Sequence, residues 1–327
     1  MHAGNNFLKN GYSILITVVL MTSCIPPIHD APPDLRTYNP SDANLLDIGY
    51  ALPYLQDFMY SIERTYLTHL MEEEGPYTVF IPVQASFATF RMKYNISHLD
   101  QFPVSELAEI LRYHFIRGKW ALSSLHRGYY PTLLLEPTSG NPVVLFIENN
   151  AVFKLNGMHL LDEPNLYATN GYIHSIKSVL DIPTAQDLLS VNENFSLILE
   201  LIHRDDLEPD LKSILTNGGP FTFLAPDNNA IQSFIDSDPT WNSVDDIPVA
   251  VINSILKNHF IGGENVVMGT LKEDRSMTSA AGHDLRIEVD YKKWIIRNTN
   301  GKATYVTAKD IQAINGVIHQ VDRLLIP

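Results

Sequence analysis

Histidine is the residue type in this sequence with the broadest capacity for chemistry, because an imidazole can act as acid, base or metal ligand near neutral pH. The chain contains 12 histidines. Two sequence-similar pairs stand out: His114 and His259 each precede Phe-Ile, and His174 and His319 each end an Asn-Gly-x-Ile-His motif. The first question is whether these imidazoles act on a ligand or support the fold.

The spacing around these histidines favours burial. His114 and His259 continue apolar stripes with helical spacing, and His174 and His319 alternate with apolar residues on one face of a strand. Buried polar groups normally have hydrogen-bond partners. We therefore interpret all four as core histidines bonded to backbone, which stay neutral and resist protonation. The asparagines that open the two motifs, Asn170 and Asn315, belong to the same structural signature.

Other patterns of catalysis or metal binding are missing from the sequence. It has no His-x-x-x-His, no paired cysteines and no Gly-x-Ser-x-Gly elbow. Asp236-Ser237-Asp238 lacks the rest of a calcium loop, and Gly218-Gly219 lacks the Lys-Ser/Thr of a phosphate loop. We predict that the protein is not an enzyme and has no catalytic residue, metal or cofactor.

The elements that position these residues occur twice. Asn170 and Asn315 start similar stretches 145 residues apart, and the same shift relates His114 to His259. Two earlier strand-like stretches, Thr78–Pro82 and Thr222–Pro226, match at a shift of 144. A repeat of this length is a domain and not a solenoid unit, so each copy should bury its own core.

Each copy shows helical spacing first and strand character afterwards, which predicts an α+β fold. The expected helices cover 44–71, 86–92 and the segment from Pro103 to His114, with counterparts around Phe195–Ile202 and from Pro248 to His259. The expected strands are 77–81, 143–148 and 152–155, then 221–225, 285–289, 294–297 and 304–307. Each copy closes on an Asn-Gly turn and a final strand.

The charge balance argues against a nucleic-acid partner. The 327 residues include 23 basic and 37 acidic side chains, for a net charge of −14, without a basic cluster. A protein that follows a phosphate backbone needs clustered Lys and Arg. The excess of acidic residues suits a soluble extracellular surface.

The N-terminal stretch resembles a bacterial lipoprotein signal. Lys9 precedes an apolar run that is too short to span a bilayer, and Leu20-Met21-Thr22-Ser23-Cys24 is similar to a lipobox. We expect residues 1–23 to be a signal peptide and Cys24, the one cysteine, to be acylated. Residues 24–42 are then a Pro-rich spacer. This places the protein at the cell envelope, anchored in the membrane by lipid, and we assign it to the outer membrane of a Gram-negative bacterium.

The repeated motifs resemble those of fasciclin domains. The stretch Thr222–Ala230 is similar to the first signature of that family, Asn315–Leu325 is similar to the second, and His114 and His259 are similar to its central histidine motif. The resemblance implies two tandem domains, 43–183 and 184–327, each a β-sandwich-like wedge with helices packed around it. It also implies a secreted or surface-anchored protein of cell adhesion.

Two short motifs match segments that the resemblance associates with receptor binding. Asp310-Ile311 lies shortly before the second signature, and Tyr113-His114 lies in the central helix. Each motif is present in only one copy, because the other copy has Asn165-Leu166 and Asn258-His259 at these places. We keep Tyr113, His114, Asp310 and Ile311 as candidate partner-binding residues, with core packing of Ile311 and His114 as the alternative.

These observations predict a lipid-anchored, non-enzymatic envelope protein that contacts an extracellular protein or glycan. The alternative is a carbohydrate-binding accessory lipoprotein of a glycan-uptake system, in which exposed aromatic rings would stack on sugars. Its candidate rings are Trp120, Tyr129, Tyr130, Trp241 and Trp294. The connection at 181–184 is short, so we also expect little motion between the domains.

Overall fold

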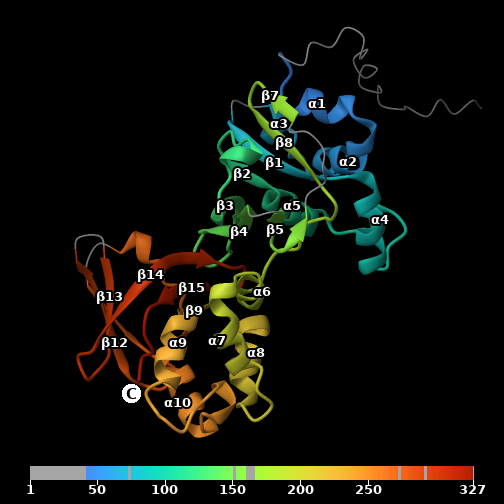
Figure 1. Cartoon of the computed structure of the whole chain (residues 1–327). Coiled ribbons are helices and arrows are strands. Elements are labelled where there is room, and N and C mark those ends of the chain that lie inside the picture. The colour runs from blue at the N-terminus through green and yellow to red at the C-terminus, as the bar shows by residue number, and fades with distance from the viewer. Residues whose placement is uncertain are drawn as a thin grey trace, which may run out of the picture.

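The computed structural model describes residues 42–72, 75–149, 152–159, 166–271, 274–290 and 293–326. They form two domains that follow one another along an elongated molecule, with the C-terminus in the second domain (Figure 1). Helices α1 to α5 and strands β1 to β8 make up the first domain, and α6 to α10 with β9 to β15 make up the second. Each domain combines a curled sheet with a group of helices, so the predicted α+β class is confirmed.

Five helices of the first domain pack on one face of its sheet. Asn44 caps the first of them, since its side chain accepts a hydrogen bond from the Asp47 amide while the Asp47 carboxylate binds the Asn44 amide. In the second helix Phe58, Met59 and Ile62 lie on the buried face. The helices are α1 (Leu45–Ala51), α2 (Gln56–Arg64), α3 (His69–Glu72), α4 (Gln84–Lys93) and α5 (Val104–Tyr113).

The sheet of the first domain has the order β6-β5-β4-β3-β2-β1-β8-β7, and β1 and β8 are its parallel neighbours. Side chains of β1 alternate between two cores, because Val79 and Ile81 face the helices while Phe80 faces the far half of the sheet. The strands are β1 (Tyr77–Pro82), β2 (Phe115–Arg117), β3 (Gly128–Leu135), β4 (Pro142–Asn149), β5 (Phe153–Leu155), β6 (Met158–His159), β7 (Leu166–Ala168) and β8 (Gly171–Ile176).

The second domain repeats this plan with the strand order β10-β9-β15-β14-β13-β12-β11 and a parallel β9–β15 pair. Its helices are α6 (Ala185–Ser190), α7 (Ser196–Ile202), α8 (Pro209–Asn217), α9 (Asn228–Ile235) and α10 (Val249–His259). Its strands are β9 (Phe221–Pro226), β10 (Phe260–Gly262), β11 (Arg275–Thr278), β12 (Asp284–Asp290), β13 (Lys293–Arg297), β14 (Ala303–Gln312) and β15 (Val317–Val321).

Irregular register bends each sheet into two layers. Strand β14 pairs with β13 near its start and with β15 farther on, and its register with β15 shifts on both sides of Ala308. Strand β3 has a similar shift between Pro131 and Leu135. Such shifts bend a strand and increase its twist. The layers enclose a second apolar core in each domain, which accounts for the sandwich-like wedge.

The sequence did not predict every element. Strand β3 was missed, because Pro131 interrupts a run whose apolar residues do not alternate. The short strands β2 and β10, which follow directly on helices α5 and α10, were missed as well. Pro103 and Pro248 are the residues immediately before their helices and not part of the first turn.

The glycines of the two Asn-Gly motifs are needed for close packing of parallel strands. Gly171 lies opposite Tyr77, and a Cβ added to it would stand 2.0 Å from the Tyr77 carbonyl oxygen. A Cβ on Gly316 would stand 2.8 Å from the Phe221 carbonyl oxygen. Neither glycine is among those with positive φ. The turn expected at Asn-Gly therefore lies just before each glycine, which belongs to the strand entry.

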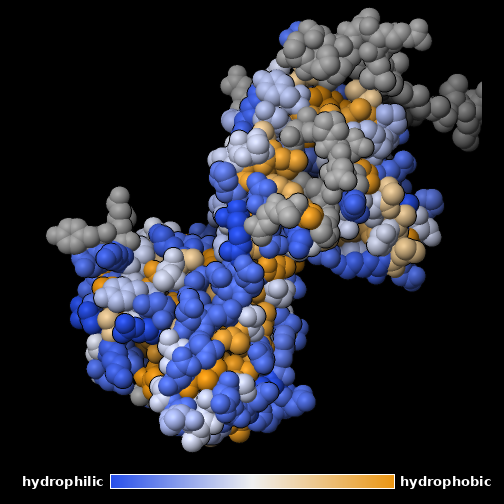
Figure 2. Space-filling view, in the orientation of Figure 1, coloured by the Kyte–Doolittle hydropathy of each residue, from blue (hydrophilic) through white to orange (hydrophobic). Residues whose placement is uncertain are grey.

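The two domains meet through β3 and β4 of the first domain and through α6, β14 and the turn before β15 of the second. Val144 and Tyr129 pack against the helical core of the second domain, and Ile314 packs against the sheet core of the first. The Ile314 amide also donates to the Pro183 carbonyl at 3.1 Å. Figure 2 shows apolar colour at the waist between the domains. The expectation of limited interdomain motion has a structural basis in these contacts.

Candidate functional site

The central histidines are part of the core in both domains. His114 and His259 are fully buried. The Nδ1 atom of each ring forms a hydrogen bond with a carbonyl oxygen of the preceding helical turn: His114 with Ile110 at 2.7 Å and His259 with Ile255 at 2.8 Å. Each Nε2 accepts a backbone amide of the closing segment, from Leu180 and from Leu325, at 3.0 Å in both cases. This pairing requires neutral imidazoles with the proton on Nδ1, because Nε2 faces an N–H group.

The motif histidines are buried as well and connect the last strand to a loop. His174 Nε2 lies 2.8 Å from the Trp120 carbonyl oxygen, and His319 Nε2 lies 2.8 Å from that of Val266. The second ring is bonded on both sides, since its Nδ1 accepts the Asp310 amide at 3.1 Å. Among the described residues, no group pairs with Nδ1 of His174. The prediction that the four histidines are buried and bonded to backbone is confirmed.

Burial lowers the pKa of His114, His174 and His259 to about 4. It also lowers the pKa of His319, although the nearby Asp310 carboxylate opposes this shift. A general base works best with a pKa near the ambient pH and within reach of a substrate. All four rings are buried out of reach of a substrate, and three of them also have a pKa far below neutral pH. Their arrangement in the folded domains is that of core residues.

The side chains of Asn170 and Asn315 connect the helical layer to the last strand by hydrogen bonds. Asn170 Oδ1 accepts the Leu45 amide at 2.8 Å and its Nδ2 donates to the Met71 carbonyl at 2.9 Å. Asn315 makes the same contacts with Ala185 and Leu215, both at 2.9 Å. One amide side chain in each domain thus joins the first helix, the end of a later helix and the strand entry.

A buried threonine in each domain was missed by the sequence reasoning. Thr78 Oγ1 donates to the Gly118 carbonyl at 2.8 Å and accepts the Trp120 amide at 2.9 Å. Thr222 Oγ1 makes the equivalent contacts with Glu264 and Val266 at the same distances. Its presence in both copies of an otherwise apolar strand was the available signal, since a buried hydroxyl needs a partner.

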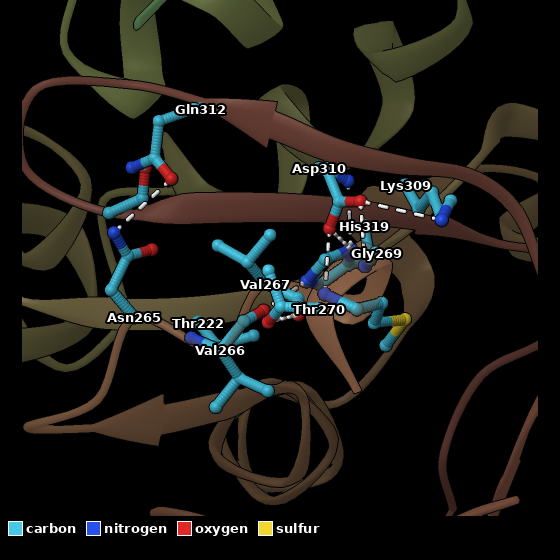
Figure 3. A network of polar contacts seen from close by, with 12 residues as sticks. Thr222, Asn265, Val266, Val267, Gly269, Thr270, Lys309, Asp310, Gln312 and His319 are labelled. Atoms are coloured by element: carbon cyan, nitrogen blue, oxygen red, sulfur yellow. Dashed lines mark hydrogen bonds and ion pairs between the residues drawn. The ribbon is translucent and has the colours of Figure 1, made fainter. Parts of the chain in front are cut away.

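The candidate binding pair Asp310-Ile311 lies at a bulge of β14. Asp310 has a φ of 59°, and its carboxylate accepts the amides of Met268 at 2.7 Å and Gly269 at 2.9 Å. Figure 3 shows this carboxylate directed at the loop backbone, with Lys309 beside it at 3.6 Å. Ile311 is 1% exposed. The aspartate therefore holds the loop before β11 against β14, and the isoleucine packs in the core.

The second candidate pair, Tyr113-His114, is inaccessible from the surface of the folded domain. Both residues have 0% exposure. The Tyr113 hydroxyl donates to the Val144 carbonyl at 3.0 Å and accepts from Asn156 Nδ2 at 2.7 Å, and burial raises its pKa. The structure does not bring this pair near Asp310-Ile311 in one site, since each pair supports the core of its own domain.

The junction between the domains contains a polar cluster that the sequence reasoning also missed. Asn265 Nδ2 donates to Glu136 Oε2 at 2.9 Å, to Ser139 Oγ at 2.8 Å and to Gln312 Oε1 at 3.2 Å. Glu136 is 2% exposed; burial acts to raise its pKa, but hydrogen bonds from Ser139 and Thr138 outweigh burial and lower it. No sequence signal could connect residues 129 positions apart.

A second group of polar contacts, around Asn192, also joins the domains. Asn192 Oδ1 accepts from Arg127 at 2.9 Å, and its Nδ2 donates to the Tyr129 hydroxyl at 2.8 Å. Burial raises the pKa of Tyr129 to about 12. Arg127 also lies 3.4 Å from Glu193. Tyr129, one of the rings proposed to stack on sugars, is therefore part of the domain interface.

The other candidate sugar platforms do not form an open aromatic pair. Trp120 and Tyr130 are half-buried and meet edge to face at 6.1 Å, and the Trp120 indole donates to the Arg117 carbonyl. Trp241 packs on Phe234 at 5.2 Å. Trp294 is 9% exposed and lies under Lys309. A pair of solvent-facing rings in a groove, which the glycan hypothesis requires, does not arise from these residues.

The surface of the described residues offers polar hollows and no metal centre. No group of three or more His, Cys, Asp or Glu in that part of the chain could hold a metal ion. One hollow, of about 650 Å³, surrounds Arg204, which binds Asp206 and the Val244 and Ile247 carbonyls. The other residues that line it are Glu200, His203, Asp205 and Asp245. It contains no evident nucleophile or phosphate-binding loop.

The predicted signal peptide, Cys24 and most of the spacer lie outside the described residues, which begin at 42. None of the helices in the described part of the chain is both long and apolar enough to span a membrane. The lipid anchor therefore stays a prediction.

Both repeats match a known protein family. The family model described as the fasciclin domain matches residues 53–183 and 193–327. The transforming growth factor-beta-induced protein ig-h3 of Oryctolagus cuniculus is 27% identical over 263 residues, which cover 79% of this chain and 35% of that protein. Human periostin is 25% identical over 271 residues, which cover 80% of this chain and 28% of periostin. The chain spans about a third of the length of these relatives.

A solved FAS1 domain pair from the insect cell adhesion molecule fasciclin I has the same architecture. It covers 84% of this chain and 97% of its own chain, with a TM-score of 0.50 and 17% sequence identity. At this identity the match concerns the fold. The sequence prediction of two tandem fasciclin-like domains is confirmed by the family match and the structural match together.

Proposed function

Because the chain belongs to the fasciclin domain family, we propose that it is a non-enzymatic adhesion protein of the cell envelope that binds an extracellular protein or glycan through its domain surfaces. The observation that carries this proposal is the use of all four repeated histidines in the core. With these four imidazoles bonded to backbone, the part of the molecule left for a partner is the surface of its domains. The likeness to a domain pair from a cell adhesion molecule supports the same function.

The joined domains suit this function. The contacts of Asn265 with Glu136 and of Asn192 with Tyr129 fix the surfaces of the two domains relative to each other. A partner that touches both domains then binds a preformed surface, and binding does not have to include the ordering of the two domains. The acidic balance of the chain, with a net charge of −14, favours partners with basic surfaces.

The attachment that we propose is a lipid on Cys24, followed by the Pro-rich spacer up to residue 42. One acyl chain gives marginal membrane binding, and several chains give durable anchoring. Cys24→Ser is expected to abolish acylation and release the protein from membranes, as measured by mass spectrometry of the N-terminal peptide and by detergent phase partition. An unacylated wild-type N-terminus would refute the anchor and leave the adhesive function of the domains to be tested separately.

Adhesion is tested with beads that carry the purified protein. These beads are expected to adhere to intact bacterial cells more than albumin-coated beads do. Protease treatment of the cells should remove adhesion to a protein partner, and periodate oxidation should remove adhesion to a glycan. Adhesion equal to that of albumin beads, or turnover of a glycan or ester substrate by the purified protein, would contradict the proposal.

A further inference from the structure

A hollow of about 240 Å³ lies on the first domain between the end of α4, helix α5 and the start of the domain connection. We call it the α4–α5 hollow. It is smaller than the roughly 300–1,000 Å³ of a typical small-molecule site. Its size therefore suits one long side chain better than an oligosaccharide. The residues that line it are Lys93, Tyr94, Phe102, Glu106, Glu109, Ile110, Asp181 and Ile182.

The floor of the α4–α5 hollow is apolar and fixed. The Tyr94 ring lies 4.7 Å from the Phe102 ring and 4.8 Å from the Phe90 ring, so three aromatic side chains hold one another in place. Tyr94 keeps 38% of its surface exposed. Lys93 Nζ lies 5.3 Å from the centre of the Tyr94 ring. The exposed part of this ring, on its packed base, is therefore a preformed contact for the aliphatic stem of a ligand and not for a second cation.

The rim of the hollow is acidic. Lys93 forms a 2.5 Å ion pair with Asp181, and this contact outweighs the effect of burial and raises the pKa of Lys93. Glu106 and Glu109 form no ion pair or side-chain hydrogen bond with any described residue. With the lysine neutralised by Asp181, two carboxylates remain for a ligand. The rim therefore attracts a cation.

The second domain provides an internal comparison. By the 145-residue shift, Phe102 and Ile110 correspond to Ile247 and Ile255, which line a crevice of only about 10 Å³ in the second domain. Glu106 and Glu109 correspond to Val251 and Ser254. The repeat thus has a closed, apolar crevice at the place where the first domain has an open, acidic hollow. The fold does not require the carboxylates, because the second domain forms the same helix without them.

We propose that the α4–α5 hollow binds an arginine or lysine side chain of a partner polypeptide, an inference that rests on the proposed adhesive function. The aliphatic stem packs on Tyr94 and Ile182, and the cationic head lies at Glu106 and Glu109. Long basic side chains combine these two needs, because their stems are apolar and their heads remain charged. Arginine fits best, since its planar head has several N–H donors in a fixed fork that matches carboxylate oxygens.

The first test uses N-acetyl-arginine amide as the probe and N-acetyl-citrulline amide as a neutral control of the same shape. Titration of the isotope-labelled protein to ~10 mM, a range suited to weak binding, is followed by amide chemical shifts in NMR. Saturable shifts are expected at 93–94, 102–110 and 181–182. Citrulline should bind ~5- to 10-fold more weakly, because it loses the ion pairs with both carboxylates, each worth up to ~5-fold in affinity at a partly exposed site.

Variants separate this site from general attraction to an acidic surface. Glu106→Gln with Glu109→Gln should weaken the arginine probe ~5- to 10-fold. Asp245→Asn, in the larger acidic hollow, should leave it unchanged. Circular dichroism checks that each variant is folded. Equal binding of arginine and citrulline, shifts centred on the larger hollow, or an unaffected Glu106→Gln/Glu109→Gln variant would each overturn the proposal.

Two further experiments test the chemical class of the ligand and distinguish the role of the hollow from the adhesive function of the whole protein. Glucosamine that saturates the same amides more tightly than the arginine probe would reassign the hollow to amino sugars and overturn the polypeptide assignment. Beads coated with the Glu106→Gln/Glu109→Gln variant are expected to adhere less than wild-type beads. If the probe fails to bind while the wild-type beads still adhere, the proposed binding of a basic side chain in the α4–α5 hollow is refuted, and the proposed adhesive function is not.

Discussion

The first and second domains bury the same polar contacts, and they differ in the residues that surround those contacts. His114 and His259 each bridge a helix end to the closing segment with distances that agree to within 0.1 Å. Yet His319 has Asp310 beside its Nδ1, and the first domain has carboxylates at 106 and 109 where the second has Val251 and Ser254. Positions with the same contact in both domains maintain the fold. Positions that differ are not required by the fold and can contribute to a function of one domain.

Acid should destabilise both domains, and this is the largest effect we expect. Three histidines have a pKa of about 4 in the folded state and an ordinary value of 6.5. The unfolded chain therefore binds more protons between these values. The stability that the neutral rings provide is complete above pH 7 and is lost as the pH falls through 6.5 toward 4.

At pH 5 each of these histidines should lower the free energy of unfolding by about 2 kcal/mol relative to pH 7. Urea unfolding at a series of pH values measures the loss, and its slope near pH 5 should correspond to an uptake of about three protons on unfolding. Equal stability at pH 7 and pH 5 would contradict the neutral assignment of the rings.

Alanine at the two motif glycines should harm the first domain more than the second. A Cβ at Gly171 would approach a backbone oxygen to 2.0 Å, against 2.8 Å at Gly316. Overpacking costs about 1–3 kcal/mol, so Gly171→Ala should lie at the upper end of this range. Domain-resolved hydrogen exchange is the measurement. Gly128→Ala, at a glycine with open space around it, should be nearly neutral, and equal losses for both motif glycines would contradict the difference in strand spacing.

Removal of the Asp310 charge should affect the second domain alone. An asparagine at 310 keeps one acceptor oxygen but turns its NH₂ group toward one of the two amides that the carboxylate now accepts. We expect Asp310→Asn to cost about 1–2 kcal/mol and to speed hydrogen exchange in the loop at 266–270. Lys309→Gln removes an exposed ion pair and a contact with the Trp294 ring and should cost less than about 1 kcal/mol. A stable Asp310→Asn variant that has lost adhesion would instead mark Asp310 as a partner contact.

The smallest effect is expected at the domain junction, which neither domain could form alone. Asn265→Ala removes a donor shared by Glu136 and Ser139 and should cost about 1 kcal/mol. NMR relaxation should then show more independent tumbling of the domains than in the wild type. Asn265→Asp should have a larger effect, because the new carboxylate would lie next to the Glu136 carboxylate and repel it. Unchanged tumbling in both variants would show that the Asn265 contacts do not hold the two domains together.

The secondary structure was predictable where local patterns agree with the fold. Strand β1 was expected at 77–81 and lies at Tyr77–Pro82, and helix α4 was expected at 86–92 and lies at Gln84–Lys93. Strand β3 was not predictable, because its bend at Pro131 depends on pairing with two other strands. Strand β14 was expected at 304–307 and runs from Ala303 to Gln312, since its second half is defined by pairing with β15.

The sequence by itself determined the duplication, the α+β plan of each copy and the burial of the four repeated histidines. These properties are carried by residue type and by spacing over a few positions, which the chain shows directly. The tertiary structure alone decided that Asp310 secures a loop, that Tyr129 joins the domains and that Glu106 and Glu109 border a hollow. Such roles depend on which distant segments pack together, as Asn265 and Glu136 do across 129 positions, and no local pattern in the chain records that contact.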